Sequence, residues 1–386
     1  MKSYSQKWLS INFFAFFFTW GVFLPFWTGW LMTEKGLSVS HASIIMSAGM
    51  FARAFSTFIL FPAATKLYSL RHVMIWTSLL SLLLMALYVP ASTFLPLFII
   101  TVLFSLVYPN LLPAMESSAS VLMQVEKIHY GKSRSYGSIG YTIALLLIGV
   151  VVAIWSEQAI LWVMLMGLAV MWYFHTLPSP APLSMKPEAV EVWNKKSDYK
   201  RLLTSKPFVT VLILAILLQG AHASYYNYGY IYLQDLGVNS FYIGVILNVA
   251  VLLEILFFTQ ADRLFANKKE STLFLIAGIG STIRWVIIFL FPTVWIFIIS
   301  QLLHAVSFGI AHYAFIQFIS KRLVPTDIPA AQGMYAALAM SLSTAVLTFA
   351  GGYLYEVSPG IAFLGMTLCS VPAIILVLIT RKKFLY

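Results

Sequence analysis

Long apolar segments, separated by short polar connections, repeat along the whole chain. Each is long enough to cross the hydrocarbon core of a bilayer, which takes about 20 apolar residues in an α-helix. Because lipid offers no hydrogen-bond partners to the backbone, each segment is predicted to be helical. The pattern predicts twelve transmembrane helices, at residues 7–32, 40–64, 70–91, 94–121, 136–155, 158–177, 207–233, 240–261, 271–291, 294–318, 329–354 and 358–380.

One connection is longer and more polar than the others. Residues 178–206 hold four prolines followed by a run of charged residues, and they separate six apolar spans from six. Two similar halves joined in this way are typical of transporters with a binding site between the halves. We therefore predict an N-terminal six-helix bundle (1–177), a central loop and a C-terminal six-helix bundle (207–386). A short amphipathic helix within the loop, at 190–203, is predicted to lie on the membrane.

Composition supports a location in the membrane. Hydrophobic residues make up 60% of the 386 residues and charged residues only 10%, whereas a soluble domain carries about 25% charged residues. The first span is longer than a signal-peptide core and lacks a small-residue cleavage site, so it is interpreted as an uncleaved helix. Cys369 is the only cysteine, which excludes an internal disulfide and a metal site built from several cysteines.

Lys and Arg are distributed very unevenly between alternate connections. Of the 24 basic residues, 21 fall in the termini, the central loop and the loops predicted on the same side, and only Lys35 falls in the loops on the other side. Basic loops face the cytoplasm, so both termini are predicted to be cytoplasmic. The net charge of +11 follows from this pattern, and no nucleic-acid partner is expected.

Four charged residues stand out inside the predicted spans: Arg53, Glu116, Glu254 and Arg284. A charge at the membrane centre costs about 2.5–3.5 kcal/mol on insertion scales, so it normally faces the bundle interior and has a partner. Two acids and two bases can neutralise each other in pairs. Such pairs either handle a substrate and a proton or only hold the bundle together.

Two spans share a polar pattern with identical spacing. Members three, four and four residues apart fall on one face of each helix. They are Gln219, His222, Tyr226 and Tyr230 in the seventh span, and Gln301, His304, Phe308 and His312 in the tenth. Because imidazole titrates near pH 6.5, at about physiological pH, the histidines are candidates for proton transfer. The alternative is that they are packing residues.

Aromatic residues form a stripe along the first span, and Trp20 and Phe23 are its best candidates for ligand contact. The alternative is ordinary packing or an interfacial belt. In the fourth span, Asn110 lies between Pro109 and Pro113. Proline frees backbone carbonyls where a transmembrane helix lines a cavity, although a static kink is equally consistent with this pattern.

Motifs of enzymes and channels are absent from the sequence. There is no P-loop, no H-E-x-x-H motif and no G-x-S-x-G elbow. A T-V-G-Y-G filter sequence is also missing. We therefore predict that the chain is not an enzyme and uses no cofactor and no metal.

The most distinctive stretches of the chain are Phe23-Leu24-Pro25-Phe26-Trp27, Ala52-Arg53, Tyr130-Gly131-Lys132, Tyr136-Gly137-Ser138 and Gln219-Gly220-Ala221-His222-Ala223. With Glu254, Arg284 and His304, they resemble the phenylpropionate permease branch of the major facilitator superfamily, which is related to lactose permease-type proton symporters. The resemblance extends over essentially the whole chain. It implies the major facilitator fold and proton-coupled uptake by alternating access.

The resemblance also implies roles for individual residues. In lactose-type relatives an acid in the eighth span, an arginine in the ninth and a histidine in the tenth handle proton and substrate. Glu254, Arg284 and either His304 or His312 match these places.

Galactoside binding in the same relatives uses an acid in the fourth span with an arginine and a tryptophan in the fifth. Glu116 matches the acid. Arg134, however, is predicted to precede the fifth span, and that span has no tryptophan before Trp155 at its far end. This departure argues against a galactoside as the substrate.

The resulting hypothesis is a monomeric transporter in the bacterial inner membrane that takes up a small aromatic carboxylate, such as 3-phenylpropionate, with a proton. Arg53 or Arg284 would pair with the carboxylate, because guanidinium binds it through two hydrogen bonds. The proposed substrate-binding residues are Arg53, Trp20, Phe23, Asn110, Glu116, Gln219, His222 and Tyr226. Those proposed for proton coupling are Glu254, Arg284, His304 and His312. A sugar or nucleoside proton symporter, an exporter of hydrophobic compounds, and a membrane enzyme or receptor are the alternatives.

Overall fold

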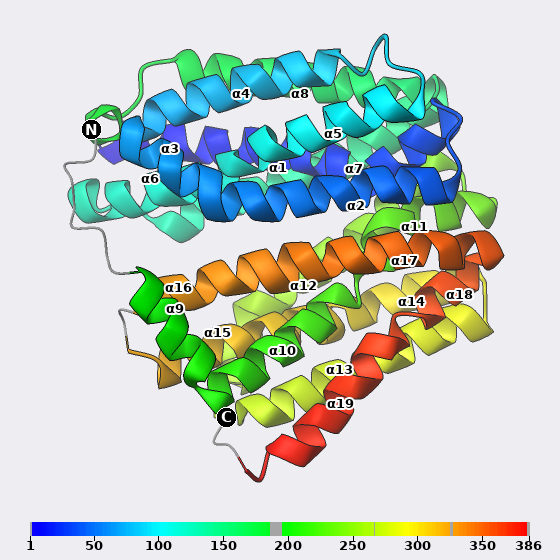
Figure 1. The fold of residues 1–386 in the computed structure, drawn as a ribbon. Coiled ribbons are helices and arrows are strands. Elements are labelled where there is room, and N and C mark those ends of the chain that lie inside the picture. The colour runs from blue at the N-terminus through cyan, green and yellow to red at the C-terminus, as the bar shows by residue number, and fades with distance from the viewer. Residues whose placement is uncertain (1, 186–194, 266, 325–326, 384–386) are drawn as a thin grey trace. The chain divides into compact units, whose positions relative to one another are not determined.

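The computed structural model describes residues 2–185, 195–265, 267–324 and 327–383, which are mostly helical (Figure 1). The helices before the central connection are α1 (Lys2–Thr33), α2 (Val39–Phe55), α3 (Phe61–Leu67), α4 (Leu70–Ala86), α5 (Phe94–Val107), α6 (Leu111–Glu126), α7 (Tyr130–Ile154) and α8 (Gln158–Thr176). Those after it begin with α9 (Lys195–Thr204), α10 (Lys206–Gly220), α11 (Ala223–Asp235), α12 (Ser240–Phe265) and α13 (Glu270–Leu290). The remaining helices are α14 (Val294–His304), α15 (Ile310–Arg322), α16 (Ile328–Met334), α17 (Ser343–Val357), α18 (Pro359–Leu364) and α19 (Thr367–Thr380).

Eleven helical stretches in the described residues are long and apolar enough to cross a membrane. The 17-residue α4 is a shorter apolar helix and occupies the place of the predicted third span. The prediction of an all-α membrane fold with twelve transmembrane helices is confirmed. Span boundaries differ in places: α4 ends at Ala86 instead of 91, and α7 begins at Tyr130 instead of 136.

Several spans are interrupted by a change of helix type. π-Helical segments connect α2 to α3 (Ser56–Leu60), α14 to α15 (Ala305–Gly309) and α16 to α17 (Tyr335–Leu342), while a 3₁₀ turn connects α5 to α6 (Tyr108–Asn110). The 3₁₀ turn contains Pro109, which removes a backbone donor from the helix. Local π-helical turns are frequent at functional sites, and those in the second and tenth spans adjoin predicted site residues.

The described chain divides into two compact units, one within residues 1–191 together with 239–245, and one within 192–238 together with 246–386. In the first unit α1 packs along α7 and α8, α2 along α5, and α4 along α8. In the second unit α13 packs on α19 and α15, and α10 on α19. Phe208, Phe274 and Phe315 belong to the apolar core of the second unit. Each unit thus has its own packed interior.

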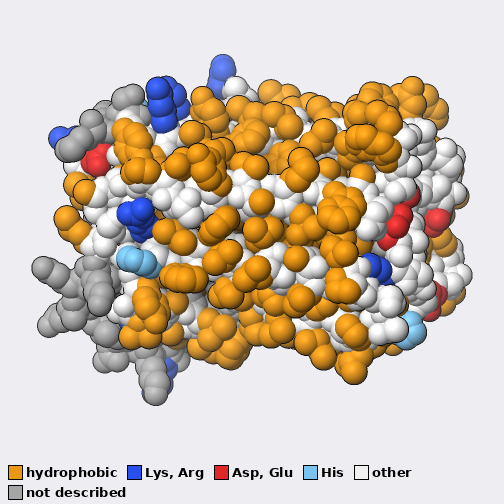
Figure 2. All heavy atoms as spheres, turned by 90° about the horizontal axis from the view of Figure 1, so that it is seen from above, with side chains coloured by type: hydrophobic (Ala, Val, Ile, Leu, Met, Phe, Trp, Pro, Cys, Tyr) orange, Lys and Arg blue, Asp and Glu red, His pale blue; other side chains and the backbone are white. Residues whose placement is uncertain are grey.

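Apolar side chains dominate the outer surface as well. Figure 2 shows hydrophobic side chains over the middle of one face, with most Lys and Arg toward one end and most Asp and Glu toward the other. Large residues such as Trp76, Leu83 and Trp162 are more than half exposed. An exposed apolar area of this extent would aggregate in water, so it indicates a surface that contacts lipid.

The central connection contributes α9, which packs on α10 and α16. Arg201 in α9 donates hydrogen bonds from Nε and Nη2 to the carboxylate of Asp327, the Nε–Oδ2 distance being 3.1 Å. α9 corresponds to the second part of the amphipathic helix predicted at 190–203. Residues 190–194 of that prediction lie outside the described residues.

The crossing of α1 and α7 requires a glycine at position 140. A Cβ added to Gly140 would lie 2.4 Å from the backbone oxygen of Phe14, and backbone cannot move aside as a side chain can. We therefore expect Gly140→Ala to destabilise the protein by about 1–3 kcal/mol and to lower its thermal midpoint in detergent. Gly131→Ala is the matched control, because nothing lies within 4 Å of a Cβ at Gly131 in the same helix. Equal midpoints for the two variants would contradict this packing argument.

Candidate functional site

Two clusters of polar and aromatic side chains contain most of the predicted site residues, one in each compact unit. Each cluster is assembled from several spans of its own unit. The first cluster surrounds Arg53 and the second surrounds Arg284.

Arg53, in the last turn of α2, lies against the aromatic stripe of α1. Its Cζ atom is 4.7 Å from the centroid of the Trp20 ring, and Tyr108 stacks on Trp20 with centroids 6.0 Å apart. The cation–π contact stabilises the guanidinium by about 0.5–2 kcal/mol. Across the described residues, no carboxylate lies within 4.0 Å of the Arg53 guanidinium. This cation is therefore held by a ring face, and its hydrogen-bond donors have no acidic partner.

Trp20, Phe23 and Arg53, three of the predicted substrate-binding residues, line one narrow pocket. Most of its wall is apolar or aromatic, with hydroxyl groups at a few positions. The other lining residues are Leu24, Met46, Gly49, Met50, Thr101, Phe104, Ser105, Tyr108 and Pro109. Phe104 stacks on Tyr108 at 4.8 Å between centroids. The ring faces can stack on an aromatic group and the guanidinium can pair with a negative charge, so the lining suits an aromatic anion.

Tyr108 was not among the predicted site residues, although it contacts Phe16, Trp20 and Phe104. Its hydroxyl lies 2.7 Å from Thr19 Oγ1 in α1. The two prolines that follow it were the only sequence signal near this position. From these prolines, Asn110 was predicted as the site residue instead of Tyr108.

Asn110 does not line this pocket. Its side-chain amide donates to Ser56 Oγ at 2.7 Å and to the backbone oxygen of Leu106 at 2.9 Å. Ser56 itself donates to that same carbonyl. Asn110 therefore connects the 3₁₀ turn of the fourth span to the π-helical segment of the second, beside Arg53.

Glu116 belongs to a separate group of side chains in the first unit. The hydroxyl of Tyr130 donates to both of its carboxylate oxygens, at 3.1 and 2.9 Å, and Arg134 Nε lies 3.7 Å from Oε1. Arg134 also covers the Phe17 ring at 4.0 Å. The prediction that Arg134 precedes the fifth span is wrong: it lies in the second turn of α7, because this helix begins six residues earlier than expected.

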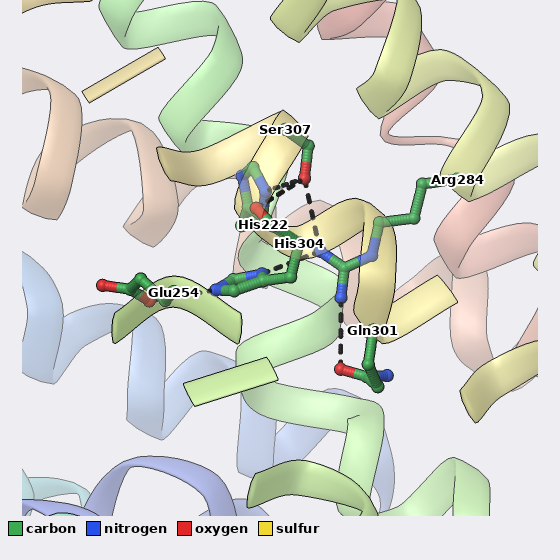
Figure 3. A network of polar contacts seen from close by, with 6 residues as sticks. All are labelled: His222, Glu254, Arg284, Gln301, His304 and Ser307. Carbon is green, nitrogen blue, oxygen red and sulfur yellow. Dashed lines mark hydrogen bonds and ion pairs between the residues drawn. The ribbon is translucent and has the colours of Figure 1, made fainter. Parts of the chain in front are cut away.

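The second cluster centres on Arg284 in α13, which is fully buried (Figure 3). Its Nη1 lies 2.9 Å from His304 Nδ1 and 3.5 Å from Ser307 Oγ, and its Nη2 donates to Gln301 Oε1 at 3.5 Å. The opposite ring nitrogen of His304 lies 3.5 Å from the Glu254 carboxylate. The histidine thus stands directly between the arginine and the acid.

His222 lies at the junction of α10 and α11. The seventh span, predicted as one helix, breaks here, and His222 occupies the last position before α11 begins. Its Nδ1 faces the carbonyl of Leu218 at 2.9 Å, and its Nε2 faces Ser307 Oγ at the same distance. Ser307 therefore contacts both His222 and Arg284.

Aromatic rings enclose this cluster. The Cζ of Arg284 lies 4.4 Å from the Tyr225 ring and 4.6 Å from the Trp285 ring. The Tyr226 ring lies 6.3 Å from that of His304. Tyr225 and Ser307 were not predicted as site residues. Ser307 follows His304 by three positions, a helical spacing that could have been used to find it.

The predicted polar face of the tenth span is present in the structure. The rings of His304, Phe308 and His312 stack in sequence, with centroid distances of 5.3 and 6.0 Å and interplanar angles of 3° and 10°. His312 Nδ1 lies 2.8 Å from the hydroxyl of Tyr335 in the eleventh span. Gln219, the remaining predicted residue, is buried in α10 one turn before His222.

The four charges of the predicted spans do not neutralise one another in the described structure. Glu116 lies near Arg134, Glu254 lies near His304, and neither Arg53 nor Arg284 has a carboxylate within 4.0 Å among the described side chains. Among the described residues, no three or more His, Cys, Asp or Glu side chains are grouped so that they could hold a metal ion.

Comparison with known proteins identifies relatives along the whole chain. The sequence profile of the MFS_1 like family matches residues 6–365. The probable 3-phenylpropionic acid transporter of Escherichia coli strain K12 is 28% identical over 374 residues, covering 96% of this chain and 97% of the relative. The maltose permease of Geobacillus stearothermophilus is 25% identical over 379 residues, covering 96% and 93%.

Solved structures with the same fold include the nucleoside transporter NupG. The superposition has a TM-score of 0.82 and covers 99% of each chain, with 18% sequence identity. At this identity the likeness shows the fold alone. The resemblance to the major facilitator superfamily and to its phenylpropionate branch, read from the residues, is confirmed by these matches.

Proposed function

Because the chain belongs to the MFS_1 like family, and is thus a secondary transporter and not an enzyme, we propose that it carries a small aromatic carboxylate together with a proton. It is a multi-pass bacterial membrane protein. The proposal includes uptake as a monomer in the inner membrane, with both termini in the cytoplasm, which the distribution of Lys and Arg supports.

The observation that carries the substrate assignment is the arrangement of Arg53 in the first unit. Its guanidinium covers Trp20 and has no carboxylate partner among the described side chains. A substrate carboxylate would supply that partner through two parallel hydrogen bonds. Phe23, Phe104 and Tyr108 would contact the aromatic ring of the substrate. The name of the Escherichia coli relative supports the same class of compound.

Proton coupling is assigned to the second unit. Glu254 is the acidic member of the cluster that contains Arg284 and His304. A carboxyl group that binds a proton loses its charge, and a carrier reorients more readily when fewer uncompensated charges lie within the membrane.

Alternating access is proposed as the mechanism, with residues 1–177 and 207–386 as the two moving bundles and 178–206 as the cytoplasmic connection. Substrate and proton each bind preferentially to states that lead to reorientation. Coupling follows because neither ligand alone shifts the population of the reorienting state sufficiently.

A panel of solutes tested with purified protein in liposomes distinguishes this function from its alternatives. We expect 3-phenylpropionate added outside to acidify the vesicle lumen, because a proton enters with each anion. We expect maltose and nucleosides neither to compete with it nor to move protons. Protein-free liposomes are the control, since the neutral acid crosses lipid unaided. Acidification no faster than in that control would contradict the proposed function.

A sugar or nucleoside symporter is the second candidate, and one observation favours it. Glu116, Tyr130 and Arg134 form a group of hydrogen-bonding side chains beside the ring of Phe17, which is a suitable combination for hydroxyl groups and a sugar ring. If maltose or a nucleoside drives proton entry in the panel and 3-phenylpropionate does not, this second candidate replaces the first.

A further inference from the structure

The two histidines of the tenth span differ in the hydrogen-bond partners that hold them. His304 and His312 lie eight residues apart on one face, with Phe308 stacked between them. Either could carry the coupled proton by residue type alone. Their partners differ in whether they can accept a hydrogen bond, and this difference decides which histidine can bind a further proton.

His304 is fixed in the neutral form by Arg284. A guanidinium has only donors, so the Nδ1 of His304, 2.9 Å from Arg284 Nη1, must be the acceptor. The ring proton is then on Nε2, directed at Glu254 at 3.5 Å. Adding a second proton at Nδ1 would set N–H against N–H and place two cations in contact. His304 can accept that proton only if it leaves Arg284.

His312 has no such restriction. Its Nδ1 faces the hydroxyl of Tyr335 at 2.8 Å, and a hydroxyl both donates and accepts. The pair keeps its hydrogen bond in either protonation state when Nδ1–H donates to Tyr335, and the added proton then binds at Nε2. His312 can therefore gain and lose a proton without rearrangement of its neighbours.

Glu254 lies on the face of α12 that meets both histidines. It is beside His304, and Phe258, one helical turn further along α12, contacts the His312 ring edge to face at 5.8 Å. Glu254 and Phe258, four residues apart in α12, share that face of the helix. Glu254, Tyr335 and His304 are thus the titratable groups that face His312 from α12, from the eleventh span and from its own span.

We infer that His312, paired with Tyr335, exchanges the coupled proton with Glu254, whereas His304 is a positioning residue that stays neutral. In the transfer, the O–H bond of protonated Glu254 breaks, the proton passes through intervening water, and an N–H bond forms on Nε2 of His312, giving a carboxylate and an imidazolium. The imidazolium then releases the proton to water. His312 lies nearer than His304 to Lys321 and Arg322 at the end of α15, the end predicted to be cytoplasmic. This inference rests on the proposed proton coupling.

Substitution of His304 and of His312 by glutamine, each in turn, tests the assignment in proteoliposomes. Glutamine can accept from Arg284 and donate to Glu254 but holds them less rigidly, so His304→Gln is expected to slow proton-driven accumulation of 3-phenylpropionate without moving the pH at which accumulation is half-maximal. Glutamine cannot bind a proton, so His312→Gln is expected to lose accumulation while retaining exchange of internal for external substrate. Exchange also demonstrates that the variant is folded.

Tyr335→Phe gives an independent readout. Without the hydroxyl, the imidazolium of His312 loses its acceptor, so the pH at which accumulation is half-maximal is expected to move to lower values. Accumulation in His312→Gln equal to that of the unmodified protein, or an unchanged pH profile in Tyr335→Phe, would overturn the assignment. Failure of the unmodified protein to couple any substrate to protons would instead reject the proposed function.

Discussion

Substitution of Arg53 by glutamine is expected to raise the concentration of 3-phenylpropionate needed for half-maximal uptake by at least about 30-fold. Removing one member of a desolvated, hydrogen-bonded charge pair costs about 2–5 kcal/mol, and each 1.4 kcal/mol corresponds to about tenfold in affinity. The loss arises because glutamine supplies neither the positive charge nor the paired donors of a guanidinium. Initial rates of uptake in proteoliposomes measure the effect.

Competition with the neutral amide of the same acid distinguishes the loss of charge recognition from a general distortion of the binding pocket. The unmodified protein should prefer the acid over 3-phenylpropionamide in competition assays, and Arg53→Gln should lose that preference. Arg53→Lys should fall between the two, because lysine keeps the charge but not the planar fork. Arg71→Gln is the matched control, because Arg71 in α4 donates to the backbone oxygen of Thr176 at 3.5 Å and does not line the pocket around Arg53. If Arg53→Gln still discriminates acid from amide as the unmodified protein does, Arg53 does not bind the carboxylate.

Substitution of Glu254 by glutamine is expected to abolish accumulation against a gradient while leaving substrate exchange in place. A pH difference of one unit supplies about 1.4 kcal/mol per proton, enough for about tenfold accumulation of a solute carried with one proton. Glutamine is an isosteric neutral side chain and mimics the protonated acid permanently. The carrier can then reorient with substrate but can no longer release a proton on each cycle.

Accumulation ratios at fixed internal and external pH, measured beside exchange rates in the same vesicles, test this expectation. Glu34→Gln, in the loop after α1, is the control for removal of a negative charge elsewhere. Accumulation of substrate by Glu254→Gln as strong as that of the unmodified protein would exclude the proposed role of Glu254. Loss of both activities would place Glu254 in substrate translocation instead of proton coupling.

The membrane fold could be predicted because hydropathy is a local property. A run of about 20 apolar residues is sufficient to identify a span, and the polar interruptions placed most span ends within a few residues. The fifth span was misjudged at its start, where Lys132 and Arg134 occur. α7 begins at Tyr130 nonetheless, because a helix can extend beyond the apolar layer with charged side chains on its first turns.

The candidate residues of the tenth span could also be found from the sequence, since His304, Phe308 and His312 recur at helical spacing. The different environments of His304 and His312 could not be predicted from the sequence. Arg284 beside His304 and Tyr335 beside His312 are 20 and 23 residues distant along the chain, and nothing in local spacing says which partner meets which ring.

The sequence by itself determined the number of spans, the uneven placement of positive charge, and the residue types available for carrying a proton and an anion. All three follow from composition over short windows, because the bilayer acts on each segment independently. Only the tertiary structure decided that Arg53 lies on Trp20 with no acid beside it among the described residues, that Glu116 meets Arg134, and that His304 stands between Arg284 and Glu254. Such contacts depend on which faces of distant helices pack together, and side-chain packing selects those faces only when the spans are assembled.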